Sequence, residues 1–340
     1  MIKRKILILG GAGFIGSNAA AYFYKKGWRV TVADNFSRKT AHYNAAWLST
    51  VGAFDFKKLD LRNEKGMIQL MAEGHFHMVL HLAGQVAVTT SVLNPREDFE
   101  INALGTLNVL EAIRKKSPQT FLALASTNKV YGALDSVGVL EKKTRYIFKK
   151  TNKGISEKQP LDFYSPYGCS KGTSDQYVTD YSRIYGLKTV VFRQSCIYGP
   201  RQFGVEDQGW LAWFVIAALK KKPITIYGSG KQVRDVLFID DLVRLYMRAY
   251  ERRNDCNGQA FNVGGGVRNT LSLLELIAQL NAIWHFDICP QFKSWRPGDQ
   301  KVYISNISKA ITVLKWKPKV TVSDGLKKIV AWFQAPGVLI

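Results

Sequence analysis

The sequence is poor in cysteine, with four among 340 residues. They stand at positions 169, 196, 256 and 289, and no two of them are spaced as Cys-x-x-Cys. This scarcity argues against a disulfide-stabilised secreted domain and favours a reducing, cytoplasmic location. The basic start, MIKRK, leads directly into an apolar run, so we expect no secretion signal.

Long hydrophobic runs and metal-ligand patterns are also missing. The longest apolar stretch, Leu211 to Leu219, has nine residues, whereas a helix that crosses a bilayer needs about 20. The five histidines, at 42, 75, 77, 81 and 285, do not form two clusters with the spacing of a metal site. We therefore expect neither a membrane span nor a bound metal.

Acidic residues are scarce relative to basic ones, 26 against 48, which gives a formal net charge of +22. This excess favours anionic partners, such as phosphorylated small molecules, nucleic acid or an anionic membrane surface. A basic surface without any specific partner fits the composition equally well. Because the basic residues are spread along the chain and not interleaved with aromatics in one stripe, no specific nucleic-acid partner is expected.

Short apolar runs alternate with helical periodicity along the first part of the chain. We predict strands at 5–9, 29–34, 78–83, 120–125 and 189–193, and helices at 14–26, 102–116 and 167–185. Repeated units of this kind predict an α/β fold, a Rossmann-like doubly wound parallel sheet with helices on both faces. The polar, basic segment 135–166 is expected to form a surface loop with local structure.

The alternation weakens after residue 194, where aromatic residues cluster. A chain of this length fits two coupled domains. We predict a Rossmann domain over 1–193, to which 236–264 returns. A smaller C-terminal α/β lobe, formed by 194–235 and 265–335, is expected to face the substrate.

A glycine-rich turn joins the first predicted strand to the first predicted helix. Residues 11–16 fit G-x-G-x-x-G, and Gly10 precedes them. Such a turn lets the backbone approach a pyrophosphate, and the helix N-terminus adds free N–H groups and partial positive charge. Asp34 ends the second strand, where a carboxylate accepts the ribose hydroxyls of a dinucleotide. A carboxylate there repels a 2′-phosphate, so we expect NAD and not NADP, a preference that the nearby Arg38 weakens slightly.

Two other strand ends are expected at the same edge of the sheet. The segment 81–85 closes a strand at its carboxyl end, where open α/β sheets bind ligands. Asp60 and Leu61 follow an alternating segment and are candidates to contact the adenine. A simple strand end on the surface explains these two residues nearly as well.

Tyr167 and Lys171 are four residues apart in a predicted helix, so their side chains share a face. A phenol with a pKa of about 10 is a poor base at neutral pH. A neighbouring ammonium and the positive nicotinamide ring of oxidised NAD favour the phenolate and lower this pKa. The phenolate would remove a sugar hydroxyl proton as hydride passes to NAD. Thr127 is the predicted third group that holds this hydroxyl, although a capping turn also explains Ser126 and Thr127.

Taken together, these motifs resemble the extended short-chain dehydrogenase/reductase family of nucleotide-sugar epimerases and dehydratases. The resemblance runs from residue 5 to about residue 333 and is carried by GGAGFIG at 10–16, Asp34, TNKVYG at 127–132, YGCSK at 167–171 and RDV at 234–236. Within the family, the chain looks most like epimerases that act at C2 of a CDP-sugar and serve O-antigen lipopolysaccharide synthesis. The features of this narrower match are STNKVYG at 126–132, GPRQF at 199–203, DQGW at 207–210, WF at 213–214, GKQVRDV at 230–236 and LSLLEL at 271–276.

The resemblance implies tightly bound NAD, transient oxidation at C2, and return of the same hydride to the other face of the sugar. It assigns catalysis to Thr127, Tyr167 and Lys171. The cofactor positions that it implies, or that the motifs above predict, are Gly10, Gly13, Phe14, Ile15, Gly16, Asp34, Asn35, Arg38, Asp60, Leu61, Leu82, Ala83, Gln85, Asn102, Tyr167 and Lys171. The expected substrate positions are Thr127, Asn128, Gln208, Gln232, Arg234, Arg296 and Asp299.

Within this substrate set, the resemblance places the nucleotide diphosphate on Arg234 and Arg296 and the substrate ribose near Asp299. Trp210 falls on a loop expected to meet the nucleotide, and a position in the core is equally compatible with its type. Cys196 departs from the family pattern, because many relatives carry an asparagine there that touches the substrate. A thiol is a weaker hydrogen-bonding group than an amide, so we assign no role to it. The resemblance also implies a homo-oligomer, a dimer or a tetramer.

Three alternative functions compete with this interpretation. A 4,6-dehydratase carries Asp-Glu directly after the threonine, whereas this chain has Asn128 and Lys129, which lack the carboxylic acids needed for elimination. A UDP-hexose 4-epimerase would use the same catalytic and cofactor residues, and the sequence does not separate C2 from C4 chemistry. A nucleotide-sensing or RNA-associated Rossmann protein would often have lost the catalytic pair, and here both Tyr167 and Lys171 are present.

Overall fold

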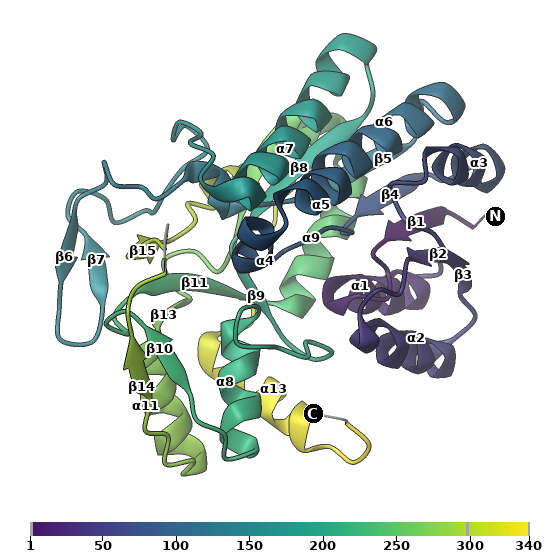
Figure 1. The fold of residues 1–340 in the computed structure, drawn as a ribbon. Helices are drawn as coiled ribbons and strands as arrows, with labels where there is room; N and C mark the ends of the chain where they lie inside the picture. The colour runs from purple at the N-terminus through teal and green to yellow at the C-terminus, as the bar shows by residue number, and fades with distance from the viewer. Residues whose placement is uncertain (1–2, 297–298, 339–340) are drawn as a thin grey trace.

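The computed structural model describes residues 3–296 and 299–338. Its main element is a seven-stranded sheet in the order β12-β8-β5-β4-β1-β2-β3 (Figure 1). Every neighbouring pair in this sheet is parallel. The strands are β1 (Lys5–Leu9), β2 (Arg29–Asp34), β3 (Asp55–Lys58), β4 (Met78–His81), β5 (Phe121–Thr127), β8 (Thr189–Gln194) and β12 (Gln259–Val263). The predicted doubly wound α/β fold is therefore confirmed.

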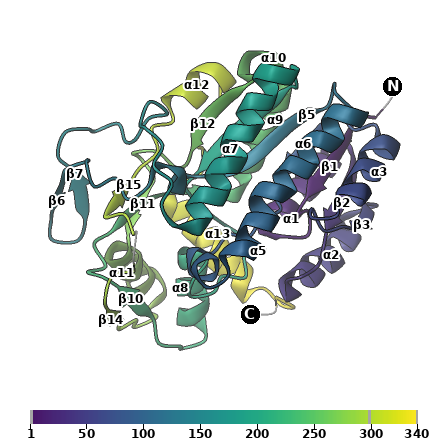
Figure 2. The same cartoon turned by 45° about the horizontal axis from the view of Figure 1, so that its top comes forward.

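Helices cover both faces of the sheet, because its apolar strands present side chains alternately to either side. Ile6 and Ile8 of β1 belong to one buried cluster, and Leu7 and Leu9 belong to another. The first face is covered by α1 (Phe14–Lys25), α2 (Lys39–Val51) and α9 (Ile239–Glu251). The second, which faces the viewer in Figure 2, is covered by α3 (Glu64–Gly74), α6 (Gly105–Lys116) and α7 (Ser165–Tyr185).

Several strand and helix ends differ from the predicted ones. The strand predicted over 78–83 ends at His81, and the helix predicted from Tyr167 begins at Ser165. The strand predicted to end at Ala125 continues to Thr127, so Ser126 and Thr127 are the last strand residues and not a separate turn. The helix predicted from Asn102 begins at Gly105, because the preceding Glu100–Leu104 forms a π-helical turn, η1. This turn follows two short helices, α4 (Val88–Leu93) and α5 (Pro95–Phe99).

The smaller lobe is built on a second sheet, in which β11 (Val233–Phe238) pairs with three other strands. These are β9 (Cys196–Tyr198), β13 (Thr270–Ser272) and β15 (Val302–Tyr303). The pair β10 (Thr225–Tyr227) and β14 (Gln291–Lys293) lies beside it, with helices α8 (Trp210–Leu219), α11 (Leu273–Trp284) and α13 (Val322–Gln334) (Figure 1). The polar segment 135–166 contains a short hairpin of β6 (Val139–Glu141) and β7 (Tyr146–Phe148).

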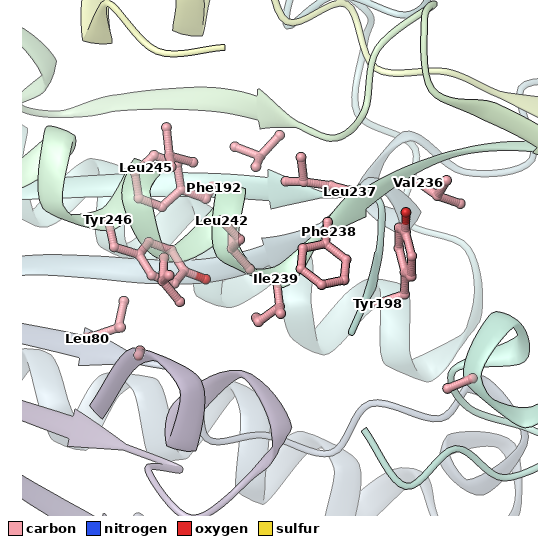
Figure 3. Packing of buried hydrophobic residues seen from close by; sticks show 14 of the residues in the cluster. Leu80, Phe192, Tyr198, Val236, Leu237, Phe238, Ile239, Leu242, Leu245 and Tyr246 are labelled. Atoms are coloured by element: carbon pink, nitrogen blue, oxygen red, sulfur yellow. The ribbon is translucent and has the colours of Figure 1, made fainter. Parts of the chain in front are cut away.

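The chain passes between the large sheet and the lobe several times. It leaves the sheet after β8, returns through α9 and β12, and leaves again before β13. A last short helix, α12 (Ser308–Leu314), packs back on β12, near the small helix α10 (Arg253–Cys256). One apolar core therefore runs from the sheet to the lobe, and Figure 3 shows Leu80 and Phe192 beside side chains of β11 and α9.

The order of the strands locates the binding crevice. From β1 the chain proceeds through β2 to β3 on one side, and from β4 through β5, β8 and β12 on the other. In open parallel sheets, ligands bind outside the carboxyl ends of the strands where the order reverses, which here is between β1 and β4. Among the described residues, no helix is both long and apolar enough to cross a membrane.

Candidate active site

A single cleft of about 1020 Å³ opens at this strand reversal and extends under the lobe. All the predicted catalytic and substrate residues line it, and so do all the predicted cofactor residues except Asn102. Segments from residue 9 to residue 299 contribute to its walls. We call the side formed by 10–16, 34–38 and 82–85 the cofactor wall, and the side formed by Asp207, Gln232, Arg234, Arg296 and Asp299 the substrate wall.

The glycine turn on the cofactor wall has no room for side chains. Gly10 has a φ of +75°, and a Cβ there would lie 2.7 Å from the backbone nitrogen of Ala83. A Cβ on Gly16 would lie 2.1 Å from the carbonyl oxygen of Gly10. Helix α1 begins directly after Gly13, and no side chain caps it. The first N–H groups of a helix have no partner within the helix, so they are available to a phosphate. The turn therefore fits a dinucleotide phosphate.

Asp34 closes the cofactor wall at the end of β2. One carboxylate oxygen accepts the Ala12 N–H at 3.1 Å and the other accepts the Phe36 N–H at 2.9 Å. Burial raises the pKa of Asp34, while these two hydrogen bonds and Arg38 oppose the rise. Each oxygen retains a second lone pair, so the carboxylate is still able to accept ribose hydroxyls.

Asp60 lines the cleft beside Asp34, but its carboxylate is already engaged. Arg62 binds both oxygens, at 3.0 and 2.8 Å, and Asn35 donates to one of them at 3.0 Å. The hydrogen bonds from Arg62 hold the pKa of Asp60 well below its usual range. Asp60 thus acts on this wall through Asn35, whose amide it orients, while Leu61 supplies apolar surface.

Asn102 lies behind the cofactor wall. It is 1% exposed, and its amide accepts the Gln85 N–H at 3.0 Å and donates to the Gln85 carbonyl at 3.1 Å. It also donates to Ser170 at 3.1 Å and to Asp98 at 3.2 Å. Asn102 therefore positions the 82–85 segment and the catalytic helix from behind and does not line the cleft.

The catalytic residues come from β5 and from the first two turns of α7. Lys171 is buried and donates to the carbonyl of Ala125 at 2.7 Å. Burial lowers the pKa of Lys171 to about 8, against the attraction of Asp175 and Asp98. Thr127 acts on the Tyr167 hydroxyl and favours its ionised form. The predicted triad is therefore assembled around the end of β5.

The expected lowering of the tyrosine pKa combined Lys171 with the positive ring of bound NAD, and Lys171 by itself does not produce it. Burial, together with the charge of Asp98, raises the pKa of Tyr167 to about 12, and the interaction with Thr127 opposes the rise. The Lys171 ammonium donates one hydrogen bond to the Ala125 carbonyl, and in the chain by itself its charge does not outweigh the effect of burial on Tyr167. The chain alone thus holds Tyr167 as a neutral phenol.

Two buried carboxylates support the triad and were not predicted from the sequence. Asp98 accepts from Ser170 at 2.5 Å. Asp175 accepts from Ser126 at 2.8 Å and forms a buried ion pair with Arg193 at 2.9 Å. The serine within YGCSK is a signal that a partner exists, but nothing local indicates that this partner is Asp98.

The substrate wall carries cations that are paired with carboxylates. Arg234 contacts Asp299 at 2.5 Å, and Arg296 contacts Asp207 at 2.7 Å. The Arg296 guanidinium lies 4.0 Å from the centre of the Tyr227 ring, so the ring and the carboxylate hold it in place. The predicted diphosphate-binding arginines are therefore brought to one wall.

Polar side chains of three other segments complete this side of the cleft. Gln232 donates to the Tyr227 carbonyl at 2.7 Å, and its buried Oε1 has no partner within the described part of the chain. Asn128 donates to Gln300 at 3.3 Å. Gln208 accepts from Arg38 at 2.8 Å, and this hydrogen bond joins the loop that carries Gln208 to the cofactor wall.

Cys196 and Trp210 lie together at the floor of the substrate side. The indole Nε1 of Trp210 donates to the Cys196 sulfur at 3.4 Å, and both residues line the cleft. Burial raises the pKa of the Cys196 thiol, so it is held protonated. The sequence was compatible with Trp210 either in the cleft or in the core. The residue is half-buried and lines the cleft at the start of α8.

Lys129 lines the same cleft and is a site residue that the sequence analysis did not identify. It lies two residues after Thr127 in the short 3₁₀ turn η2 (Asn128–Tyr131), and its N–H donates to the Thr127 hydroxyl at 3.2 Å.

In residues 3–296 and 299–338, no group of three or more His, Cys, Asp or Glu side chains is arranged to hold a metal.

Comparisons with known proteins agree with this geometry. Residues 6–264 match the model of the NAD dependent epimerase/dehydratase family. The chain is 46% identical to CDP-paratose 2-epimerase of Salmonella typhi over 333 residues, which cover 96% of this chain and 98% of that protein.

Solved structures of epimerases share the whole fold. The UDP-glucose 4-epimerase of Thermotoga maritima, solved with UDP-glucose, is 31% identical with a TM-score of 0.82, covering 97% of this chain and 98% of that one. The UDP-glucose 4-epimerase of Thermus thermophilus, solved with NAD, is 29% identical with a TM-score of 0.79, covering 98% and 99%.

Proposed function

The chain belongs to the NAD-dependent epimerase/dehydratase family, and we propose that within it the enzyme inverts C2 of CDP-paratose to give CDP-tyvelose. NAD is its cofactor, and a nucleotide-diphosphate sugar is its substrate class. The observation that carries the proposal is the full-length 46% identity to a CDP-paratose 2-epimerase together with a complete triad in the cleft. The product would supply an activated sugar for O-antigen lipopolysaccharide.

When bound, NAD supplies the acceptor and donor of hydride and a positive ring beside the phenol. The chain's own residues move the proton. With NAD bound, the ionised Tyr167 oxygen takes the proton of the sugar hydroxyl and becomes a neutral phenol. It later returns this proton to the sugar oxygen, which Thr127 holds in line. The Lys171 ammonium, fixed on the Ala125 carbonyl, stabilises the negative charge that Tyr167 acquires.

The contents of the substrate wall support a nucleoside diphosphate. Planar guanidinium groups bind phosphate oxygens in pairs, and Arg234 and Arg296 supply two of them. Asn128 and Lys129, which follow Thr127, offer no carboxylic acid for the elimination of water. The residues Asn128 and Lys129 therefore favour epimerisation over dehydration.

Inversion at C4 of a UDP-hexose is the second candidate, supported by solved 4-epimerases at 29–31% identity. The same triad serves either carbon, because the position of the sugar decides which hydroxyl meets Tyr167. The identity of 46% to the 2-epimerase favours C2.

The deciding experiment is incubation of the purified enzyme with CDP-, UDP-, GDP- and dTDP-sugars, followed by NMR of the ring protons. We expect inversion at C2 of CDP-paratose, with a deuterium label on that carbon retained in ordinary water. Inversion at C4 of a UDP-hexose would replace the first candidate with the second, and loss of the label to solvent would contradict hydride return.

We also propose that the enzyme is a cytoplasmic homo-oligomer. Its four cysteines are free thiols, as expected in a reducing compartment. Helices α5 and α7 lie together and expose large apolar side chains, namely Phe99, Tyr177, Ile184 and Tyr185. A second copy would cover such a face, and light scattering on the purified enzyme measures this directly.

A further inference from the structure

Lys129 is held in an electrostatically unbalanced position on the cleft. Its Nζ lies 3.8 Å from Asp299, which is longer than an ordinary hydrogen bond. The same carboxylate oxygen is taken by Arg234 at 2.5 Å. Two cations therefore share one carboxylate, and the group of three carries a net charge of about +1.

The described residues give this ammonium little else. Across residues 3–296 and 299–338, Asp299 is the one partner found for it within 4 Å. Burial and the charge of Arg234 both lower the pKa of Lys129, and Asp299 opposes them. An anion placed beside Lys129 would oppose this lowering of the pKa, because its negative charge stabilises the ammonium. The side chain is 26% exposed and lines the cleft, so a ligand is able to reach it.

The location of Lys129 indicates which anion this is. Its backbone N–H donates a hydrogen bond to the hydroxyl of the catalytic residue Thr127. Its ammonium interacts electrostatically with Arg234, Asp299 and Cys196. It therefore lies between the residues that hold the reacting hydroxyl and the arginines of the substrate wall. In a nucleoside diphosphate sugar, the group at this intermediate place is the phosphate attached to the sugar.

We infer that Lys129 is a positioning residue that binds the sugar-side phosphate of the nucleotide sugar, exchanging its long contact with Asp299 for this ligand. The inference rests on the proposed function in its substrate class, and it does not depend on which carbon inverts. An ammonium is a compact charge on a flexible stem, so it is able to follow this phosphate while the sugar presents each face to Tyr167.

The test compares nucleoside diphosphate with nucleoside monophosphate binding by calorimetry. The enzyme with its NAD is titrated with CDP and CMP, or with the matching pair if UDP, GDP or dTDP binds better. In Lys129→Met, we expect the affinity for the diphosphate to fall about 10- to 100-fold and that for the monophosphate to stay within about twofold. Lys129→Arg should restore part of the loss.

Lys65→Met, on the exposed surface of α3, is the matched control and should leave both affinities unchanged. Retained NAD and an unchanged melting temperature show that Lys129→Met is folded. In turnover with the nucleotide sugar, KM should rise far more than kcat falls.

Each of the following results would overturn the assignment. Equal losses for diphosphate and monophosphate would move Lys129 away from the sugar-side phosphate. An unchanged diphosphate affinity with a raised KM would place it on the sugar. If the wild-type enzyme binds no nucleoside diphosphate, the proposed function fails and the inference fails with it. If the wild-type enzyme binds the diphosphate tightly and Lys129→Met binds it equally tightly, only the inference fails.

Discussion

The cofactor wall and the substrate wall face each other across one cleft, but they are built by different means. The cofactor wall is mainly backbone: a glycine turn, the start of α1 and a strand end at Asp34, all within the first 34 residues, together with the 82–85 segment that follows β4. The substrate wall is made of charged side chains from positions 207, 234, 296 and 299, held in ion pairs. Backbone geometry thus fixes the cofactor site locally, whereas the substrate site depends on charges that meet only after folding.

The catalytic tyrosine stands between the two walls and offers the largest effect. Tyr167→Phe should reduce kcat by about 10²- to 10⁴-fold, because the group that exchanges the hydroxyl proton is lost. Both walls stay intact, so bound NAD and nucleotide-sugar affinity should be retained. Steady-state kinetics and release of NAD on denaturation measure these quantities.

Tyr177→Phe, an exposed position on the same helix, is the control for this variant and should keep full activity. Turnover of Tyr167→Phe within tenfold of wild type would assign the proton transfer to another group. Loss of NAD from the variant would show that the two walls are not independent of Tyr167.

On the substrate wall, Arg234→Met should weaken nucleotide-sugar binding by about 2–4 kcal/mol, because Arg234 is a largely buried partner of Asp299. Arg296→Met, whose side chain is more exposed, should cost about 1 kcal/mol. Calorimetry with the nucleoside diphosphate measures both. Weaker NAD binding in either variant would break the separation of the two walls.

On the cofactor wall, Asp34→Ala should weaken NAD binding by about 1–3 kcal/mol, because it removes charge-assisted hydrogen bonds. It also frees the Ala12 and Phe36 N–H groups that now donate to Asp34. Asp34→Asn, which retains an acceptor, should lose less. The measurement is NAD affinity by fluorescence, and unchanged affinity would move the ribose contact elsewhere.

The smallest effect is a pH dependence of stability in the NAD-free protein, due to Lys171. Its pKa falls from 10.5 to about 8 on folding, so the unfolded chain binds more protons between these values. Stability therefore rises with pH through this window relative to Lys171→Met, by about 1.5 kcal/mol from pH 8 to 9.5. Urea unfolding of the two proteins at several pH values measures the difference, and parallel curves would contradict the lowered pKa.

Much of the fold was predictable because its signals are local. The strands at 5–9 and 29–34 have the predicted bounds. Lys5 and Gly10 flank the apolar run of the first strand, and Asp34 ends the second. Among the ends that differ, those at Thr127 and Gly105 depend on pairing with β8 and on a π-helical turn. The spacing of apolar residues along the chain indicates neither feature.

The same distinction applies to the site. Residues within a motif were predicted to face the cleft and do so, but Asn102 was predicted as a ligand and instead braces Gln85 from behind. Tyr167 was expected to have its pKa lowered by Lys171 and NAD together, and in the chain by itself burial raises it. Burial and side-chain direction are properties of the packed molecule, and spacing along the chain does not specify them.

The sequence by itself determined the parallel sheet, the glycine cradle, the acid at Asp34 and the Tyr167–Lys171 pair, because each follows from neighbours a few residues apart. Tertiary structure alone decided that Asp98 and Asp175 support this pair, that Arg234 and Lys129 share Asp299, and that Arg38 reaches Gln208. The physical reason is that ion pairs and buried hydrogen bonds form between groups that only the folded chain brings within a few ångströms of one another.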